Sequence, residues 1–371
     1  MNVALWASLF WGWTALAAAP PERLLRCAWT NYHRNFVQRD GRVIDPAGGN
    51  ISTSEGQAYG MIRAVWIDDQ NRFDAMRNWT RDNLQGGDFG ALPAWKWGER
   101  DDGSWGVLDT NPAADADQWM AYALLFAAEI WDEPDYRRQA LELLDAIWSE
   151  ETEELLGRRY MLPGPWARTA EAGDVLRLNP SYFLPFAWRV FSVHDVEHDW
   201  MAMVDDHYTL LEEVMADGSL PPDWLFLHSI SGEFVVPPPH LPEAAYFGYE
   251  AWRLSWTLAA EVAWYDEPRA RALLVPVANL GTNWRRDGRI VSQLDTDGSP
   301  VTEHDYLGLY GALLPAWALA RPEDVNALYT RHIEPQRARH GWGDAEDYYS
   351  NNWVWLGIAL WNGIAAPLEE S

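Results

Sequence analysis

Apolar residues recur at helical spacing along most of the chain, whereas alternating strand-like patterns are few. After residue 54, for example, Ala58, Met61, Ile62 and Val65 follow one another at i, i+3, i+4 and i+7, which is typical of a helix with one buried face. The chain is therefore expected to be all-α. The pattern predicts twelve helices, at residues 22–37, 54–68, 71–84, 116–131, 134–149, 180–194, 198–215, 245–264, 267–284, 303–319, 322–332 and 345–362.

Twelve helices group into six antiparallel pairs, which predicts a closed double ring, the (α/α)6 barrel. Two turns of an α-solenoid are the alternative, although no short-period repeat is visible. Longer loops separate some of the pairs, and the segment 224–238 predicts a small β-hairpin. No Ser/Gly-rich linker divides the chain, so residues 20–371 are expected to form a single domain. In such a ring, the N-terminal ends of the inner helices converge on one face, where a groove would hold an extended polymer.

Tryptophan is unusually abundant, with 25 in 371 residues. A tryptophan side chain packs between helices and also stacks on sugar rings. Most of these residues are expected in the core, and a minority in a groove would serve a carbohydrate enzyme. The formal charge is −27 and Lys96 is the only lysine, so nucleic acid and anionic membrane surfaces are unfavourable partners.

The N-terminus carries an uncharged apolar run that ends in small residues, at residues 3–19. This run predicts a secretory signal peptide over residues 1–19, cleaved near Ala17 to Ala19, because it is short for a membrane span. The single cysteine, Cys27, cannot form an internal disulfide, so export is inferred from the leader alone.

The stretch "STSEGQ" places a carboxylate at a helix start. Ser54 and Gln57 have capping-box spacing, which predicts Ser54 as the N-cap and puts Glu55 in the first turn. Glu55 can serve there simply as a partner of the helix dipole. As a catalytic acid it needs a raised pKa, and we expect burial to outweigh the dipole.

Two other helix starts carry acids. Asp115 and Asp117 are two residues apart at a predicted helix start, and capping the helix requires only one aspartate. One of them can therefore cap the helix while the other projects into a cleft. Glu250 and Arg253 are spaced i, i+3, which fits either a surface ion pair or a pair in a cleft. The histidines lack metal-site spacing and no G-x-S-x-G motif occurs, so we expect no metal and no cofactor. Acids at three helix starts, together with many tryptophans, point to glycoside hydrolysis.

The motifs "SEGQAYGM", "AADADQWMAYALL" and "GYEAWR" together resemble glycoside hydrolase family 8. The segments "DGRVIDP", "LPAWKWG", "LNPSYF" and "DYYSNNWVWLG" also resemble the endoglucanases of this family that are encoded with bacterial cellulose synthases. The similarity extends over residues 27–362 and implies an (α/α)6 fold with inverting chemistry.

The resemblance also implies roles for individual residues. Glu55 matches the proton donor, and Asp115 matches an aspartate at the sugar of the cleavage subsite, although Ala114 replaces the usual Ser or Thr. Glu250 stands where relatives of this family place the aspartate that acts as general base, and glutamate preserves the carboxylate while extending the side chain by about one bond. The remaining matches are to substrate-binding positions, namely Trp95, Asp117, Tyr182, Arg253 and Tyr349.

The expected activity is endo-acting hydrolysis of a β-1,4-linked glucan chain by a periplasmic or secreted monomer, with cellulose synthase or its export machinery as a partner. The same fold acting on chitosan, mixed-linkage glucan or xylan is an alternative, and the acidic surface would attract cationic chitosan. A second alternative is a catalytically impaired glucan-binding subunit, for which the departure at Glu250 is the motivation.

Overall fold

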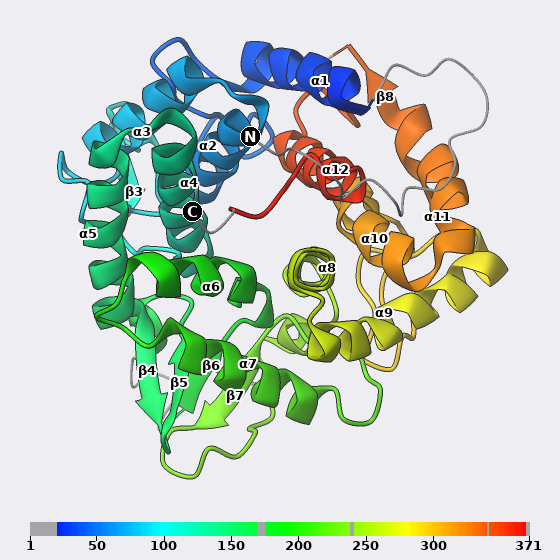
Figure 1. The fold of residues 1–371 in the computed structure, drawn as a ribbon. Helices are drawn as coiled ribbons and strands as arrows, with labels where there is room; N and C mark the ends of the chain where they lie inside the picture. The colour runs from blue at the N-terminus through cyan, green and yellow to red at the C-terminus, as the bar shows by residue number, and fades with distance from the viewer. Residues whose placement is uncertain (1–20, 169–174, 238–240, 340, 369–371) are drawn as a thin grey trace, which may run out of the picture.

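The computed structural model describes residues 21–168, 175–237, 241–339 and 341–368. The described chain forms two concentric rings of helices (Figure 1). The inner ring consists of α2 (Ser54–Ile67), α4 (Ala114–Trp131), α6 (Pro185–His194), α8 (Arg253–Tyr265), α10 (Leu307–Ala320) and α12 (Tyr348–Trp361). The outer ring consists of α1 (Pro21–Phe36), α3 (Gln70–Asn83), α5 (Pro134–Glu151), α7 (Trp200–Val214), α9 (Pro268–Asp287) and α11 (Pro322–Leu328).

The predicted (α/α)6 barrel is confirmed, because each inner helix contacts the next and α12 returns to α2 to close the ring. An open solenoid would lack that last contact, so the alternative was wrong. The predicted signal peptide, residues 1–19, lies outside the described residues.

One connection recurs three times between an inner helix and the outer helix that follows it. Asp68, Asp132 and Asp266 end α2, α4 and α8 in the left-handed conformation, with φ of 60°, 52° and 50°. Aspartate tolerates this conformation better than most residues do. In each case an acidic residue follows and the outer helix begins at once, so the helices of each pair are antiparallel neighbours.

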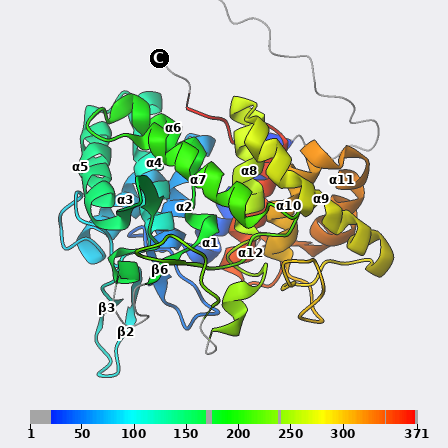
Figure 2. The same ribbon diagram turned by 90° about the horizontal axis from the view of Figure 1, so that it is seen from below.

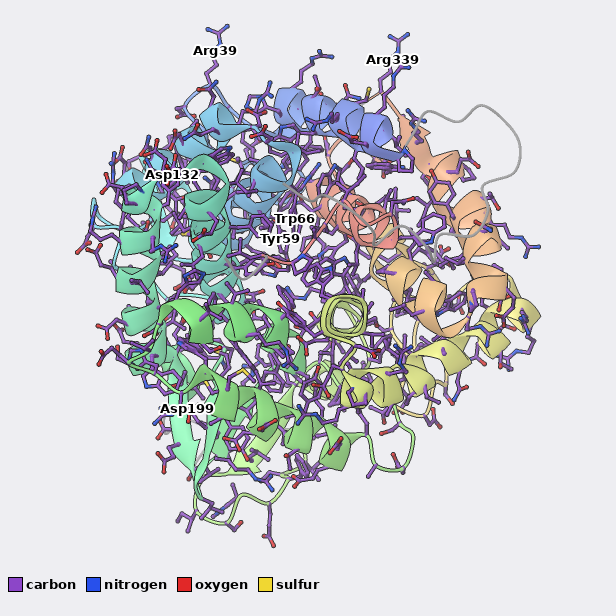
Figure 3. The ribbon with its side chains drawn as sticks, in the orientation of Figure 1. Arg39, Tyr59, Trp66, Asp132, Asp199 and Arg339 are labelled. Carbon is purple, nitrogen blue, oxygen red and sulfur yellow. The ribbon has the colours of Figure 1, made fainter. Side chains whose placement is uncertain are left out.

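Tryptophan and glycine explain how the inner ring is filled. Trp66, Trp119, Trp256 and Trp355, from four different inner helices, have ring centroids 5.6–6.5 Å apart around the barrel axis. Figure 3 shows Trp66 in the middle of the ring. Where α10 and α12 cross, a Cβ added to Gly357 would lie only 2.0 Å from a backbone oxygen of α10, so this contact requires glycine. Within the described residues, most tryptophans are buried or packed against the core, as the sequence predicts.

Short strands occupy the long connections. They form a three-stranded sheet and three two-stranded sheets: β1 (Ser52–Thr53), β2 (Lys96–Glu99) and β3 (Trp105–Asp109); β4 (Thr152–Leu155) and β5 (Arg158–Met161); β6 (Val175–Leu178) and β7 (Leu225–His228); β8 (Arg337–Ala338) and β9 (Gly341–Trp342). The hairpin predicted at 224–238 is only partly present. Its first strand is β7, but β7 pairs mainly with β6, and the returning segment contributes a single bridge, Leu227 to Phe234.

Among the helices that begin later than their sequence pattern indicated, α6 and α8 differ most, by five and eight residues. Helix α6 begins at Pro185 because residues 180–182 form a separate 3-10 turn. Helix α8 begins at Arg253, eight residues after the predicted start at 245, because the chain before it forms a loop in which Phe247 pairs with Leu294. This later start places Glu250 in a turn instead of within a helix.

Candidate active site

Arg253 brings together the three carboxyl groups that the sequence singled out. Glu55 is the second residue of α2, Asp115 is the second residue of α4, and Arg253 opens α8, so three inner helices begin at this point. The Nη1 atom of Arg253 donates to Glu55 Oε1 at 2.6 Å and to Asp115 Oδ2 at 3.0 Å. Its Nη2 atom pairs with Glu250 Oε2.

The start of α2 is fixed differently from the sequence prediction. Thr53, not Ser54, is the N-cap, and its Oγ1 accepts from the backbone N–H three residues later at 3.0 Å. Gln57 does not complete a capping box: its side chain is fully buried, accepts from the N–H of Val43 and donates to the carbonyl oxygen of Met76 at 3.1 Å. Glu55 is thus rigidly placed between a capped helix start and a buried anchor.

The environment of Glu55 favours its protonated form. Burial raises the pKa of the Glu55 carboxyl, the negative charge of Glu250 adds to this, and Arg253 opposes it. Tyr59, one helical turn further, donates its hydroxyl to Glu55 Oε1 at 2.8 Å. The direction of the pKa shift agrees with the expectation that burial outweighs the helix dipole.

Glu250 is held by a loop that a buried carboxylate organises. One oxygen of Asp223 accepts the backbone N–H groups of Gly248, Glu250 and Ala251 at 2.9, 3.2 and 2.7 Å. Burial raises the pKa of Asp223 to about 7. The side chain of Glu250 accepts from Asn179 Nδ2 at 2.8 Å and is 30% exposed. The turn, and not a helix face, directs Glu250 toward Arg253.

The cluster has more acids than bases. Burial, followed by the neighbouring charge of Glu55, raises the pKa of Asp115 to about 8. Three ionised carboxylates around one guanidinium would leave two uncompensated charges in a largely buried site, so at least one proton stays bound at neutral pH. The side chain of Glu55 is 20% exposed and that of Asp115 only 6%, so Glu55 is better placed to deliver this proton to a ligand.

Asp117 does not fit the predicted role of a substrate contact. Its side chain is fully buried and lies beside the equally buried Glu151 of α5, so that each carboxyl influences the pKa of the other. Neither acid caps α4, because the N-cap is Ala113 and it makes no side-chain cap bond. Burial raises the pKa of both Asp117 and Glu151 well above the usual range, so this pair retains a proton.

The three aromatic residues predicted for the groove lie around the carboxyl cluster. The carbonyl of Trp95 accepts from the N–H of Ser54 at 3.0 Å, which places Trp95 beside the start of α2. The ring of Tyr182 lies 5.4 Å from the guanidinium carbon of Arg253. Tyr349 is the second residue of α12. Its hydroxyl lies close enough to Arg253, Glu55 and Glu250 for their charges to influence its pKa.

Several residues of the site were not singled out from the sequence. Ser181 Oγ accepts from Arg253 Nη2 at 3.0 Å and donates to Asn179 Oδ1 at 2.7 Å, so a short chain of hydrogen bonds orients the arginine. An asparagine before a proline is a turn-start signal and could have identified Asn179. Tyr59 is at i+4 from Glu55, a spacing that places both on one helix face. Asp223 carried no local signal.

Comparisons with known proteins agree with this architecture. The model for "Glycosyl hydrolases family 8" matches residues 1–359. An endoglucanase of Pseudomonas fluorescens is 38% identical over 217 residues, which cover 57% of this chain and 54% of the relative, so the chain spans about half the length of that relative. An endoglucanase of Escherichia coli K12 is also 38% identical, over 200 residues and 53% of each chain.

Solved structures extend the likeness to the whole barrel. Endoglucanase Cel10 of Klebsiella pneumoniae, a family 8 glycosyl hydrolase, superimposes with a TM-score of 0.70 at 26% identity, over 91% of this chain and 99% of that one. A β-1,3-1,4-glucanase of a Paenibacillus species has a TM-score of 0.77 at 17% identity, over 92% of each chain, which shows the fold alone. From the family match over nearly its full length, we conclude that the chain belongs to glycosyl hydrolase family 8.

Proposed function

We propose that this protein is an endo-acting β-1,4-glucanase that hydrolyses cellulose-like chains with inversion at the anomeric carbon. The observation that supports this proposal is that Glu55 and Glu250 bind different nitrogens of the Arg253 guanidinium, at the end of the barrel where inner helices begin. Glycoside hydrolysis requires an acid for the leaving oxygen and a second carboxylate for water or the sugar carbon. This arrangement supplies both groups.

Glu55 is the proposed general acid. Burial raises the pKa of its carboxyl and so favours the protonated acid, yet one fifth of its side chain is exposed to a ligand. It donates its proton to the glycosidic oxygen as the bond to the anomeric carbon breaks. Tyr59, whose hydroxyl bonds the same carboxyl, stabilises the carboxylate that remains.

Glu250 is the proposed general base. Asn179 and Arg253 both donate to its Oε2, which orients the other oxygen for a water molecule. Inverting enzymes leave about 6.5–9.5 Å between the two carboxyl groups, whereas retaining enzymes leave about 5–5.5 Å. The guanidinium of Arg253 lies between Glu55 and Glu250, and inversion is the course that the family resemblance implies.

Asp115 and the aromatic residues are proposed to hold the sugar. Asp115 is bound to Arg253 and carries a raised pKa, so its protonated form can donate to a sugar hydroxyl at the cleavage point. The half-buried rings of Trp95, Tyr182 and Tyr349 offer apolar faces around the cluster. Sugar rings stack on such faces.

The substrate is proposed from the relatives, which are named endoglucanases. The decisive assay measures reducing ends released from carboxymethylcellulose, lichenan, xylan and chitosan in parallel, with Glu55→Gln as the inactive control. We expect carboxymethylcellulose to be hydrolysed, with viscosity falling faster than reducing ends appear. Preferential hydrolysis of another polymer would overturn the proposed substrate, and equal activity of the control would overturn the proposed acid.

We further propose that the protein is exported to the periplasm or the medium, acts as a monomer and works beside the cellulose synthase or export machinery. Support for export comes from the apolar leader at residues 3–19. In the part of the chain that the structure describes, none of the helices has the length and apolar character to cross a membrane. Determining the N-terminal residue of the protein isolated from fractionated cells tests the proposed export.

A further inference from the structure

The hairpin of β2 and β3 carries an exposed tryptophan that the proposed mechanism does not use. Trp105 opens β3 and is 44% exposed, although it lies next to buried and half-buried aromatic residues. Figure 2 shows this hairpin extending below the helices, on the side opposite the C-terminal end. Helix α12 runs from Tyr349 near the cluster toward that C-terminal end, so the hairpin projects from the face that holds the carboxyl cluster.

The ring of Trp105 is held rigidly from behind. Its centroid lies 5.3 Å from that of Trp97, and Trp97 packs edge-on against Trp79 of α3, also at 5.3 Å. The guanidinium of Arg42 lies 4.4 Å from the Trp97 ring and 4.7 Å from the Trp105 ring. Arg42 is itself buried and donates to Ser52 Oγ at 2.8 Å. A fixed aromatic ring binds a ligand without the entropy cost of ordering a mobile one.

The hairpin is attached directly beside the proposed general acid. Thr53, the cap of α2, pairs with Lys96 of β2, and Trp105 pairs with Glu99, three residues further along the same strand. At about 3.3 Å per residue, Trp105 lies about 10 Å beyond that pairing, roughly the reach of a short oligosaccharide. Trp95 stands directly before β2 at the base of the hairpin, where its carbonyl accepts from the N–H of Ser54 at the start of α2.

We propose that Trp105 is an outlying contact for a neutral glucan chain that continues out of the catalytic groove along the β2–β3 hairpin. The inference rests on the proposed glucanase function. The strongly negative net charge disfavours a polyanionic occupant. Glu99, which pairs with Trp105 across the hairpin, offers a carboxylate acceptor for sugar hydroxyls. The contact lengthens the bound segment of a polymer and leaves short substrates unaffected.

The test compares Trp105→Ala with the wild type on carboxymethylcellulose and on cellotetraose. We expect kcat/KM on the polymer to fall about three- to tenfold, the range expected for one aromatic contact, while kcat/KM on cellotetraose stays unchanged. Trp105→Tyr should restore most of the polymer activity. An equal loss on both substrates, or no loss on the polymer, would overturn the proposal.

Leu108→Ala is the matched control, because Leu108 is 38% exposed on the same strand and lies close to Gly98 of the facing strand. We expect it to leave polymer hydrolysis unchanged, and a loss equal to that of Trp105→Ala would show that hairpin integrity, and not the ring, is responsible. The retardation of each variant during electrophoresis in gels that contain the soluble polymer measures binding independently of hydrolysis. Absence of hydrolysis by the wild type would therefore count against the glucanase function, while equal retardation of wild type and Trp105→Ala would count against the outlying contact.

Discussion

Replacing Arg253 with glutamine tests the electrostatic organisation of the site. The side chain of Arg253 is 5% exposed and bonds three carboxyl groups and Ser181. Glutamine retains a polar side chain and removes the charge. The positive charge lowers the pKa of both Glu55 and Asp115, so both pKa values should rise further in the variant.

The magnitude follows from the burial of the cluster. Removing one partner of a buried ion pair costs about 3–5 kcal/mol, part of which is recovered when the carboxyls bind protons. For a chain of this length, this corresponds to a fall in Tm of about 4–7 °C. Loss of a preorganised charge in the site should also lower kcat about 10²–10³-fold.

The assay is a pH profile of kcat/KM on carboxymethylcellulose, measured beside thermal unfolding. In Arg253→Gln the basic limb should move to higher pH, because Glu55, the proposed general acid, keeps its proton to higher pH once the positive charge is removed. Arg253→Lys is the matched control: it preserves the charge and therefore the position of the limb, but loses the fork that binds two carboxyls at once, so kcat should still fall. An unchanged pH profile and Tm in Arg253→Gln would refute the central role of the arginine.

The other expected outcomes concern the carboxyl groups. Glu55→Gln should lower kcat about 10²–10⁴-fold while oligosaccharide affinity, measured by calorimetry, stays nearly intact; retained turnover would return Glu55 to the role of dipole partner. Glu250→Asp should keep measurable activity, since it restores the side chain that the family resemblance implies at this position, and Glu250→Ala should lose it; undiminished hydrolysis by the alanine variant would point to Asp115 as base. Burial raises the pKa of Glu151 in the folded state, so the native protein holds protons that the unfolded chain releases above about pH 4, and stability falls as the pH rises from there. Glu151→Gln should flatten that fall in urea denaturation measured at pH 5 and pH 8, and an equally steep fall would show that the pair with Asp117 does not cause it.

The ring of helices could be predicted from the sequence because its signals are local. Inner and outer helices alternate with short turns, and the apolar spacing of α2 identified that helix to within a residue. The cap was assigned to Ser54 instead of Thr53 because either hydroxyl suits the position. Gln57 was misread because its true partners, such as Val43 and Met76, are 14 and 19 residues away.

Part of the candidate site could also be predicted from local sequence signals. Glu55 and Asp115 lie at helix starts, where a local pattern reveals them. Glu250 lies in a turn because Asp223, 25 to 28 residues earlier, binds the backbone of that turn. Asp117 looked like a groove residue until its burial against Glu151 was known. Contacts between distant segments decided both cases, and no local spacing encodes them.

The stereochemical course of hydrolysis tests the central claim most directly. Proton NMR of cellohexaose cleavage by the wild-type protein, followed from the first seconds, distinguishes the two anomers before mutarotation mixes them. With Glu55 as acid and Glu250 as the base that activates water, the first product formed should be the α-anomer. Initial formation of the β-anomer would contradict the account, because Glu250 would then act as a nucleophile on the sugar and not as a base.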